Sequence, residues 1–412
     1  MESFIARRLY KSEQGSRKVS RPAVFIAQAG VALGLAVMLV TIAVSFGFKH
    51  EVREKAVGFS AHLHISNYES AHDYEALPIA PDTALLQLLQ DTPGVEHIQR
   101  YATKAGVLRS DGDFLGCVFK GVGKDYDLSF YRNYLKEGEL PAFSDSVISN
   151  NILISRLIAD KLLLEVGDKI DAYFLQGAMR ARRYTVAGIY DTGFSEYDRL
   201  FIVTDLKAVQ SLNRWESDQV TGVEVQLADF DKVDDMNWEL GTVLDRTEDR
   251  YGEQYLVQSV TDINPGLFAW LDVLDVNVWL ILALMIGVAA FTMISGLLIL
   301  IIERTQFIGI LKALGASNAS VRKSFLYLGM LIIGKGMLWG NVVGLGLCAI
   351  QKFTKLIPLD PANYYLDSVP IEFHWPFFLI VNITMFVLSV LILIVPSQLI
   401  SRIYPTKAMR FE

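Results

Sequence analysis

The chain has 412 residues, of which 52% are hydrophobic, and its formal net charge at pH 7 is −7. This length can hold a water-soluble domain together with a membrane part. The two cysteines, Cys117 and Cys348, are too few for a disulfide framework and lack the spacing of a metal site, so both are interpreted as inert small residues.

The apolar residues gather in four stretches, each longer than the roughly 20 residues that cross a bilayer as a helix. Backbone N–H and C=O groups find no water in hydrocarbon, so each stretch is predicted to be helical. The predicted spans are 22–48, 276–302, 324–351 and 375–401. The first is too long for the apolar region of a cleaved signal peptide and is interpreted as a retained signal anchor.

Charged residues divide the remaining segments into two groups. Lys and Arg outnumber Asp and Glu in the segments 1–21, 303–323 and 402–412, whereas 49–275 and 352–374 are acidic overall. Basic segments stay in the cytoplasm. Both termini are therefore predicted to be cytoplasmic, and the large segment 49–275 is predicted to lie outside the cytoplasm.

The outer segment 49–275 is predicted to form an α+β domain. Helical patterns occur at Ala84–Leu89, Ile152–Leu164 and Phe230–Leu244, and a turn follows the second of these at Val166–Asp168. Strands are predicted at 62–66, 118–122, 183–189, 200–203 and 223–227, and directly after the turn at 166–168.

Two charged helical segments join this domain to the first and second spans. They are Lys49–Val57 and Leu267–Leu274, and neither junction contains a Gly-Ser or Pro-rich linker. We therefore predict a stiff attachment. Such an attachment favours transmission of movement across the membrane over a loosely tethered receptor domain.

The sequence offers no convincing catalytic or metal site. The run Gly329–Gly336 approximates a phosphate-binding loop, but it lacks the final hydroxyl and lies within a predicted span. We expect no ATP, other cofactor or metal in this chain. His62 and His64 share one face of a predicted strand, and without further nearby ligands they are interpreted as a surface pair. No nucleophile elbow is present, so the chain is predicted not to be an enzyme.

Small residues and one charge distinguish the third span. Lys335 is the only charged residue in it; such a residue is often functional, but it can also face a wet crevice or reach an interface. Gly336, Gly340 and Gly344 recur every four residues, a pattern that lets helix backbones approach closely. The sequence leaves open whether their partner helix belongs to this chain or to another.

The loop between the second and third spans is the most specific segment. Phe307, Ile308, Ile310, Leu311 and Leu314 form a short apolar face at helical spacing. The sequence then predicts a helix end and a new helix start, with Gly315 at the C′ position and Ser317 as the N-cap. The short helix either turns the chain at the membrane surface or docks into a groove on a cytoplasmic partner.

This loop, Glu303–Ser317, resembles the corresponding loop of the FtsX/MacB-like permeases of ABC transporters, departing from it at Phe307, where those permeases usually carry an acid. Within that family the chain is most similar to the LolC/LolE lipoprotein-releasing permeases. Three further segments carry the resemblance: Gly47–Gly58, Asp360–Pro370 and Tyr404–Glu412. The resemblance covers the whole chain and is strongest over 276–412.

The resemblance implies a fold and a set of partners. The fold is an α-helical membrane protein with four transmembrane helices and a MacB-like α+β periplasmic domain between helices 1 and 2. The chain would sit in the cell inner membrane beside a second permease chain, identical or homologous. Two copies of a separate ABC ATPase would hold ATP and Mg²⁺. An acylated lipoprotein would be the substrate and a periplasmic lipoprotein carrier the acceptor, with no nucleic acid involved.

The resemblance also assigns roles to residues. A hairpin that docks the carrier in some members corresponds to residues 173–183, which contain no proline. The outer ends of helices 1 and 2 would line a cavity for acyl chains, with Val44, Phe46, Phe48, Leu280 and Leu284 as its candidates. The helix that couples to the ATPase would comprise Phe307, Ile308, Ile310, Leu311, Lys312, Leu314 and Gly315.

Three other functions remain open. A MacB-like permease would transmit movement to an efflux tunnel, but such chains usually carry a fused ATPase. An FtsX-like protein would activate a cell-wall hydrolase and move no substrate, but its outer domain is expected to be smaller than 49–275. A membrane-bound enzyme is the least favoured, because no catalytic constellation is present.

Overall fold

The computed structural model describes residues 20–70, 77–110, 113–144, 147–176 and 178–398. The chain divides into two compact units. The helical unit comprises Met1–Lys49, Trp270–Pro358 and Ser368–Glu412, and the sheet unit comprises His50–Ala269 and Leu359–Asp367. The predicted cytoplasmic tail 402–412 and residues 1–19 of the predicted N-terminal segment lie outside the described residues.

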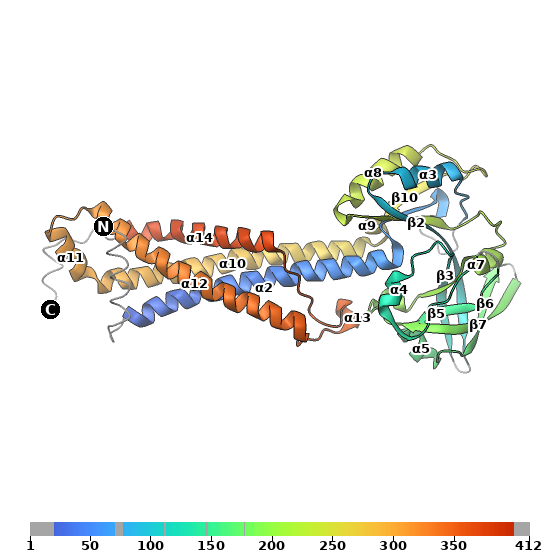
Figure 1. Ribbon diagram of the computed structural model, residues 1–412, viewed down its shortest axis with the longest axis horizontal. Coiled ribbons are helices and arrows are strands. Elements are labelled where there is room, and N and C mark those ends of the chain that lie inside the picture. Colours follow the sequence, from blue (N-terminus) through green and yellow to red (C-terminus); the bar gives the residue numbers. More distant parts are fainter. Residues whose placement is uncertain (1–19, 71–76, 111–112, 145–146, 177, 399–412) are drawn as a thin grey trace. The chain divides into compact units, whose positions relative to one another are not determined.

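Four helices are long and apolar enough to cross a membrane, as the sequence predicts. They also include the predicted charged extensions, because the first continues to Ser60 and the second begins at Pro265. A short helix, α11 (Thr305–Ala313), lies between the second and third along the chain. The four are α2 (Ser20–Ser60), α10 (Pro265–Glu303), α12 (Asn318–Thr354) and α14 (Trp375–Ser397) (Figure 1).

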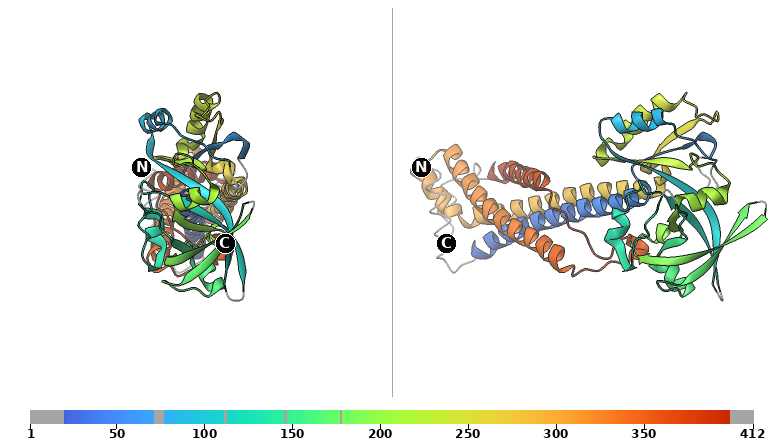
Figure 2. Two further views of the ribbon diagram at one scale, coloured as in Figure 1. Left: turned by 90° about the vertical axis from the view of Figure 1, so that its right-hand side faces the viewer. Right: turned by 45° about the vertical axis from the view of Figure 1, so that its right-hand side comes forward.

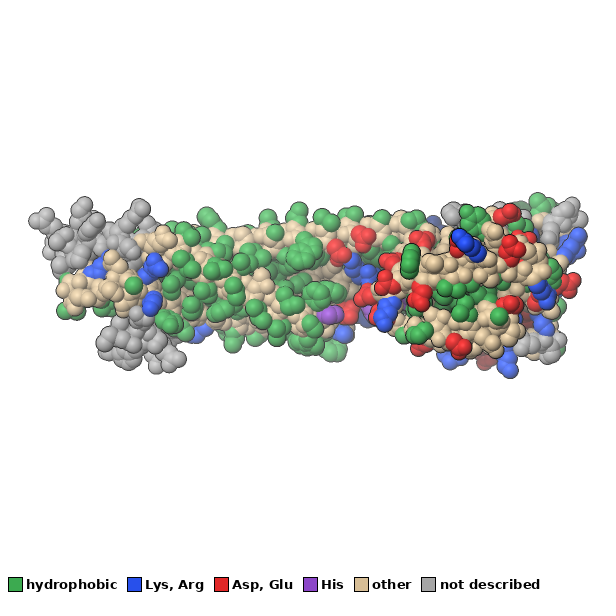
Figure 3. All heavy atoms as spheres, turned by 90° about the horizontal axis from the view of Figure 1, so that it is seen from above, with side chains coloured by type: hydrophobic (Ala, Val, Ile, Leu, Met, Phe, Trp, Pro, Cys, Tyr) green, Lys and Arg blue, Asp and Glu red, His purple; other side chains and the backbone are tan. Residues whose placement is uncertain are grey.

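The core of the helical unit forms around α2, the most buried of these four helices. Val31, Leu35 and Leu39 of α2 are fully buried, as are Phe325 of α12 and Leu393 of α14. Hydrophobic side chains also cover the outer surface of the apolar helices on the face drawn in Figure 3. An apolar exterior of this kind is expected where lipid, not water, surrounds the helices.

The sheet unit is built on one sheet, in which ten strands run in the order β10-β1-β9-β2-β3-β8-β5-β7-β4, with β6 paired to β2 and β7. Most neighbours are antiparallel, while β3–β8 and β5–β7 are parallel. The strands are β1 (Leu63–Asn67), β2 (Val95–Arg109), β3 (Phe114–Val122), β4 (Leu135–Gly138), β5 (Asn151–Ser155), β6 (Lys169–Gln176), β7 (Ala178–Tyr190), β8 (Phe201–Asp205), β9 (Gly222–Leu227) and β10 (Tyr255–Ser259).

Short helices cover this sheet: α3 packs on β2, α7 on β2 and β3, and α8 on β10. Their apolar sides join the strands in one core. The short helices of this unit are α3 (Thr83–Asp91), α4 (Ser129–Tyr134), α5 (Arg156–Leu162), α6 (Ser195–Asp198), α7 (Leu206–Asn213), α8 (Val233–Leu244), α9 (Val260–Ile263) and α13 (Pro361–Tyr364), with 3₁₀ turns at η1 (Tyr68–Ser70) and η2 (Phe230–Lys232).

The predicted strands are confirmed as β1, β3, β6, β7, β8 and β9, and the first predicted helix as α3, whose N-cap is Asp82. The predicted helix Ile152–Leu164 is wrong in its first part. Residues 151–155 form β5, because a run of Ile and Leu buried on both faces suits an inner strand. The helix begins only after Ser155, whose hydroxyl accepts a hydrogen bond from Ile158 N–H.

Candidate functional site

Helix α11 ends as the sequence predicts. Gly315 has φ +91°, a left-handed conformation that glycine adopts without steric cost. Its N–H donates to Lys312 C=O, and Ala316 N–H donates to Leu311 C=O, so the two bonds of a Schellman motif are present. Ser317 then caps α12 by accepting a hydrogen bond from Ser320 N–H. The turn between α11 and α12 is therefore closely defined.

The predicted apolar face of α11 is divided between two surroundings. Ile308 is fully buried in the core of the helical unit, and Phe307 and Leu311 pack against that core. By contrast, Ile310 is 49% exposed and Leu314 is 80% exposed. Ile308 therefore packs α11 onto the helical unit, Phe307 and Leu311 are half-buried, and the most exposed apolar residues of the predicted contact surface are Ile310 and Leu314. Lys312 and Gly315 lie beside them.

The glycine seam of α12 packs against α2 of the same chain. A Cβ atom at Gly336 would lie 2.9 Å from the carbonyl oxygen of Gln28, and one at Gly340 would lie 2.8 Å from that of Ala32. At Gly344 it would lie 3.0 Å from Ala36 Cα. A Cβ at Gly336 or Gly340 would be closer to backbone than real Cβ atoms come, and one at Gly344 would be tight, so the seam lets α12 and α2 approach closely.

Lys335 precedes this seam but is exposed on α12. The surrounding run Gly329–Gly336 is helical throughout, so it has none of the strand-loop-helix geometry of a phosphate-binding loop. Among the described residues, no group of three or more His, Cys, Asp or Glu side chains is placed to hold a metal ion.

The five candidate acyl-chain residues do not come together in one surface. Leu280 and Leu284 are exposed on α10. Val44 and Phe46 pack against the helical core, and the Phe46 ring stacks on His374 at 5.0 Å between centroids. The Phe48 ring packs edge-on against Trp270 at 5.4 Å.

The stretch 173–183 falls on the hairpin of β6 and β7, which projects from the sheet (Figure 2). Leu175 and Met179 face each other across the two strands of this hairpin. Both side chains are mostly exposed. The predicted carrier-docking stretch therefore carries two exposed apolar side chains.

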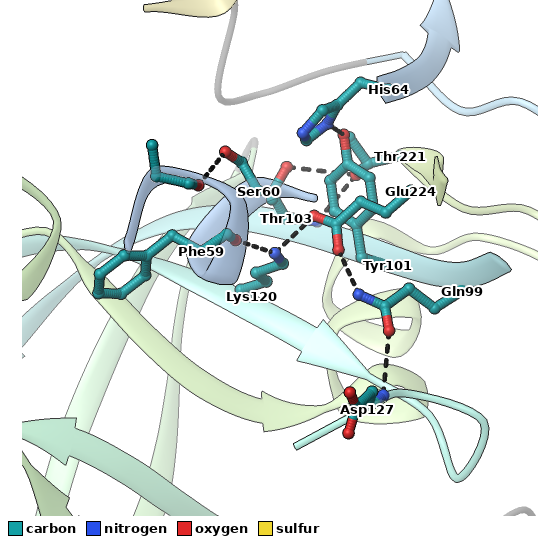
Figure 4. A network of polar contacts seen from close by, with 11 residues as sticks. Phe59, Ser60, His64, Gln99, Tyr101, Thr103, Lys120, Asp127, Thr221 and Glu224 are labelled. Atoms are coloured by element: carbon teal, nitrogen blue, oxygen red, sulfur yellow. Dashed lines mark hydrogen bonds and ion pairs between the residues drawn. The ribbon is translucent and has the colours of Figure 1, made fainter. Parts of the chain in front are cut away.

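A buried polar network in the sheet unit was missed by the sequence analysis (Figure 4). Lys120 Nζ on β3 donates to Glu224 Oε1 on β9 at 2.5 Å and to Phe59 C=O, in the last turn of α2, at 2.6 Å. Gln99 Nε2 donates to the other oxygen of Glu224 at 2.9 Å. The sequence did offer a signal for this network, because Lys120 and Glu224 each lie in the middle of an apolar strand.

Electrostatics explain how the charges of this network tolerate burial. Burial acts to raise the pKa of Glu224, but the Lys120 ammonium and the hydrogen bonds from Lys120 and Gln99 outweigh it, so the pKa lies below its usual value. His64 is also buried, with Nδ1 3.1 Å from the Tyr101 hydroxyl, and burial lowers its pKa. The prediction that His62 and His64 form a surface pair is therefore wrong for His64, because β1 is an inner strand of the sheet, and His62 is itself half-buried.

Comparison with known families identifies both parts of the chain. Residues 24–243 match the MacB-like periplasmic core domain, and residues 279–405 match the FtsX-like permease C-terminal domain. The chain belongs to the FtsX/MacB-like family of ABC transporter permeases. The second match contains α11, the glycine seam of α12 and both exposed leucines of α10.

Named relatives resemble this permease over nearly its whole length. The lipoprotein-releasing system transmembrane protein LolC of Xylella fastidiosa (strain Temecula1) is 27% identical, covering 93% of this chain and 92% of its own. LolE of Haemophilus influenzae is 24% identical, covering 98% of each. The crystal structure of the periplasmic region of MacB from Actinobacillus actinomycetemcomitans is 11% identical with a TM-score of 0.35, covering 52% of this chain and 95% of its own.

Proposed function

We propose that this permease is the membrane subunit of an ABC transporter that extracts lipoproteins from the inner membrane and hands them to a periplasmic carrier. The observation that carries the proposal is the similarity, over nearly the full length, to relatives named for lipoprotein release. Membership of the permease family supports the transport role. The chain itself would catalyse no reaction.

The distribution of charge supports an orientation for this permease. The basic segments 1–21, 303–323 and 402–412 would lie in the cytoplasm. The main part of the sheet unit, His50–Ala269, would then be a periplasmic domain inserted between transmembrane helices 1 and 2. In this arrangement α11 faces the compartment that supplies ATP.

The energy source would be a separate ATPase subunit that binds ATP and Mg²⁺. Ile310 and Leu314 are the exposed apolar residues of α11, and a short helix with apolar anchors suits a groove on such a partner. Two ATPase copies would serve two permease chains, this one and an identical or homologous second chain. The tightly capped turn at Gly315 would pass a push on α11 directly to α12.

Lipoprotein extraction needs such an energy source. Each buried acyl CH₂ group contributes about 0.8 kcal/mol to membrane anchoring, so removing several acyl chains is very unfavourable without coupling. The exposed Leu280 and Leu284 of α10 are the better candidates for acyl contact, because Phe46 and Phe48 are already packed within the chain. Leu175 and Met179 of the β6–β7 hairpin would contact the carrier.

A release assay tests the proposal. The permease and its co-purified ATPase are placed in liposomes with a triacylated lipoprotein, and ATP is added with a soluble carrier. We expect lipoprotein in the soluble fraction with ATP but not with ADP, and less with a Leu314→Asp permease. Hydrolysis of ATP with all lipoprotein retained in the liposomes would refute release and favour a permease that transmits movement to another periplasmic protein.

A further inference from the structure

The segment Leu359–Asp367, which lies between α12 and α14 along the chain, packs within the sheet unit. The Tyr365 ring meets the Phe194 ring edge-on at 4.8 Å, and the Tyr365 hydroxyl donates to Glu196 Oε1 at 3.3 Å. Leu366 is buried as well. The segment is therefore a packed part of the sheet unit.

Lys55 binds this segment to two other parts of the sheet unit. Its side chain leaves α2 and is almost fully buried. The ammonium donates to Tyr365 C=O at 2.7 Å and also to Thr192 C=O, and it lies 5.5 Å from the centre of the Tyr134 ring. One charge therefore joins α2, the loop that contains Thr192, and the segment 359–367.

Further contacts fix the two carbonyl groups that accept from Lys55. Asp198 accepts hydrogen bonds from Thr192 N–H at 3.1 Å and from the Thr192 hydroxyl at 2.8 Å, which fixes the loop that offers its carbonyl. Tyr365 has φ +62°, a conformation that costs free energy for a bulky residue and persists only where its surroundings determine it. The buried Lys55 ammonium therefore binds the carbonyl of a residue whose backbone is strained.

We propose that Lys55 is a positioning residue that fastens the segment 359–367 to the sheet unit, so that movement of α12 reaches that unit. The proposal rests on the proposed function, in which α11 receives the push from an ATPase. Along the chain, α11 leads through the turn at Gly315 into α12, and α12 leads into the segment. Near the end of α12, Gln351 bonds to Val369 C=O at 3.1 Å and to Ile357 N–H at 3.1 Å, holding both flanks of the segment.

The test uses the whole permease–ATPase complex in liposomes with Lys55→Met, which keeps side-chain length and loses the ammonium. Hydrogen exchange of the segments 192–198 and 359–367 is measured with ATP and with ADP, and release is measured per ATP hydrolysed. We expect the nucleotide-dependent difference in exchange to disappear at 192–198 and release per ATP to fall about fivefold or more. The ATPase rate should stay within about twofold of the wild-type rate.

Two further variants guard against a trivial loss of folding. Tyr365→Gly removes the ring and the hydroxyl at a backbone conformation that glycine favours but keeps the carbonyl that accepts from Lys55, so it should uncouple release less than Lys55→Met does. Lys161→Met, at an exposed lysine of α5, should match the wild type. A nucleotide response at 192–198 that persists undiminished in Lys55→Met would overturn the proposal. A wild-type complex that shows this response but releases nothing would instead contradict the proposed function alone.

Discussion

The amide groups of Asn341 on α12 and Asn382 on α14 donate hydrogen bonds to each other, with Nδ2–Oδ1 distances of 2.7 and 3.0 Å. Each Nδ2 also donates to a carbonyl of its own helix, Met337 C=O or Phe378 C=O, at 2.9 Å. Both amides are therefore satisfied among apolar helices. Such a reciprocal pair fixes one helix against the other, because any shift along the axis breaks both bonds.

Replacing one of the two asparagines leaves the other amide without its partner. We expect Asn382→Leu to destabilise the helical unit by about 0.6–2 kcal/mol. The double variant Asn341→Leu/Asn382→Leu should cost less than the sum of the single variants, because no amide is then stranded. Thermal unfolding of the full chain in detergent measures this cycle. Strictly additive losses would mean that the two amides do not stabilise each other.

Two glycines of α12 offer a matched comparison of packing. At Gly340 a methyl group would meet backbone of α2, whereas at Gly346 it would meet nothing within 4 Å. Gly340→Ala should force the helices apart and lower stability by about 1–3 kcal/mol. Gly346→Ala should leave stability unchanged or raise it by up to about 1 kcal/mol through helix propensity. Equal melting temperatures for the two variants would contradict the close contact with α2.

The sequence predicted the spacing of that glycine seam but not its partner, because a pattern on one helix does not record which helix lies opposite. It also predicted the Gly315 and Ser317 caps, whose hydrogen bonds are local. Ile152–Ile154 were misassigned, since a short apolar run fits a buried strand and a helix equally well. The contact between Lys55 and Tyr365 joins residues far apart in the chain, so no local sequence pattern predicts it.

The exposed leucine at the end of α11 should matter for coupling and not for folding. Leu314→Asp places a charge where the side chain is 80% exposed, so stability should change by no more than about 0.5 kcal/mol. Binding of the ATPase, and stimulation of its hydrolysis, should be lost. Leu163→Asp makes the same change at a leucine that is 87% exposed in the sheet unit and should leave coupling intact. If Leu314→Asp binds the ATPase as well as the wild type does, α11 is not the docking helix.

His62 should make the sheet unit sensitive to acid. Burial lowers the pKa of His62 to about 4, against an ordinary value of 6.5. Its Nδ1 accepts a hydrogen bond from Leu227 N–H at 3.0 Å. A proton on Nδ1 would turn this atom into a donor and remove that hydrogen bond. The folded state therefore binds fewer protons than the unfolded state between these two pKa values. Stability from this site is complete above about pH 6.5 and declines as the pH falls toward 4.

An asparagine at position 62 separates titration from packing. His62→Asn retains an oxygen that can accept the Leu227 N–H but has no proton to gain. Denaturant unfolding of the full chain between pH 7.5 and 4 should show a shallower loss of stability for this variant than for the wild type. Identical slopes for the two proteins would assign the acid sensitivity to other groups.

The Lys120–Glu224 pair should be the costliest single disruption in the sheet unit. Lys120→Met leaves the Glu224 carboxylate buried with its hydrogen bond from Gln99 but without a counter-charge. Removing one partner of a buried ion pair destabilises by about 3–5 kcal/mol. The double variant Lys120→Met/Glu224→Gln carries no charge at this site and keeps an oxygen for Gln99. It should therefore be more stable than Lys120→Met alone.

The pH dependence distinguishes a stranded charge from lost packing. In the wild type the pKa of Glu224 lies below its ordinary 4.5, so the stability it contributes is present above about pH 4.5 and is lost as the pH falls. Without Lys120, burial dominates and the pKa rises, so the variant loses stability as the pH increases. The deficit of Lys120→Met relative to wild type should therefore widen from acidic to neutral pH. As a control, the stability of Lys120→Met/Glu224→Gln is compared with that of Glu224→Gln; without a carboxylate at position 224, this deficit should not change with pH. A deficit of Lys120→Met relative to wild type that stays constant with pH would show that the lysine contributes packing and not charge.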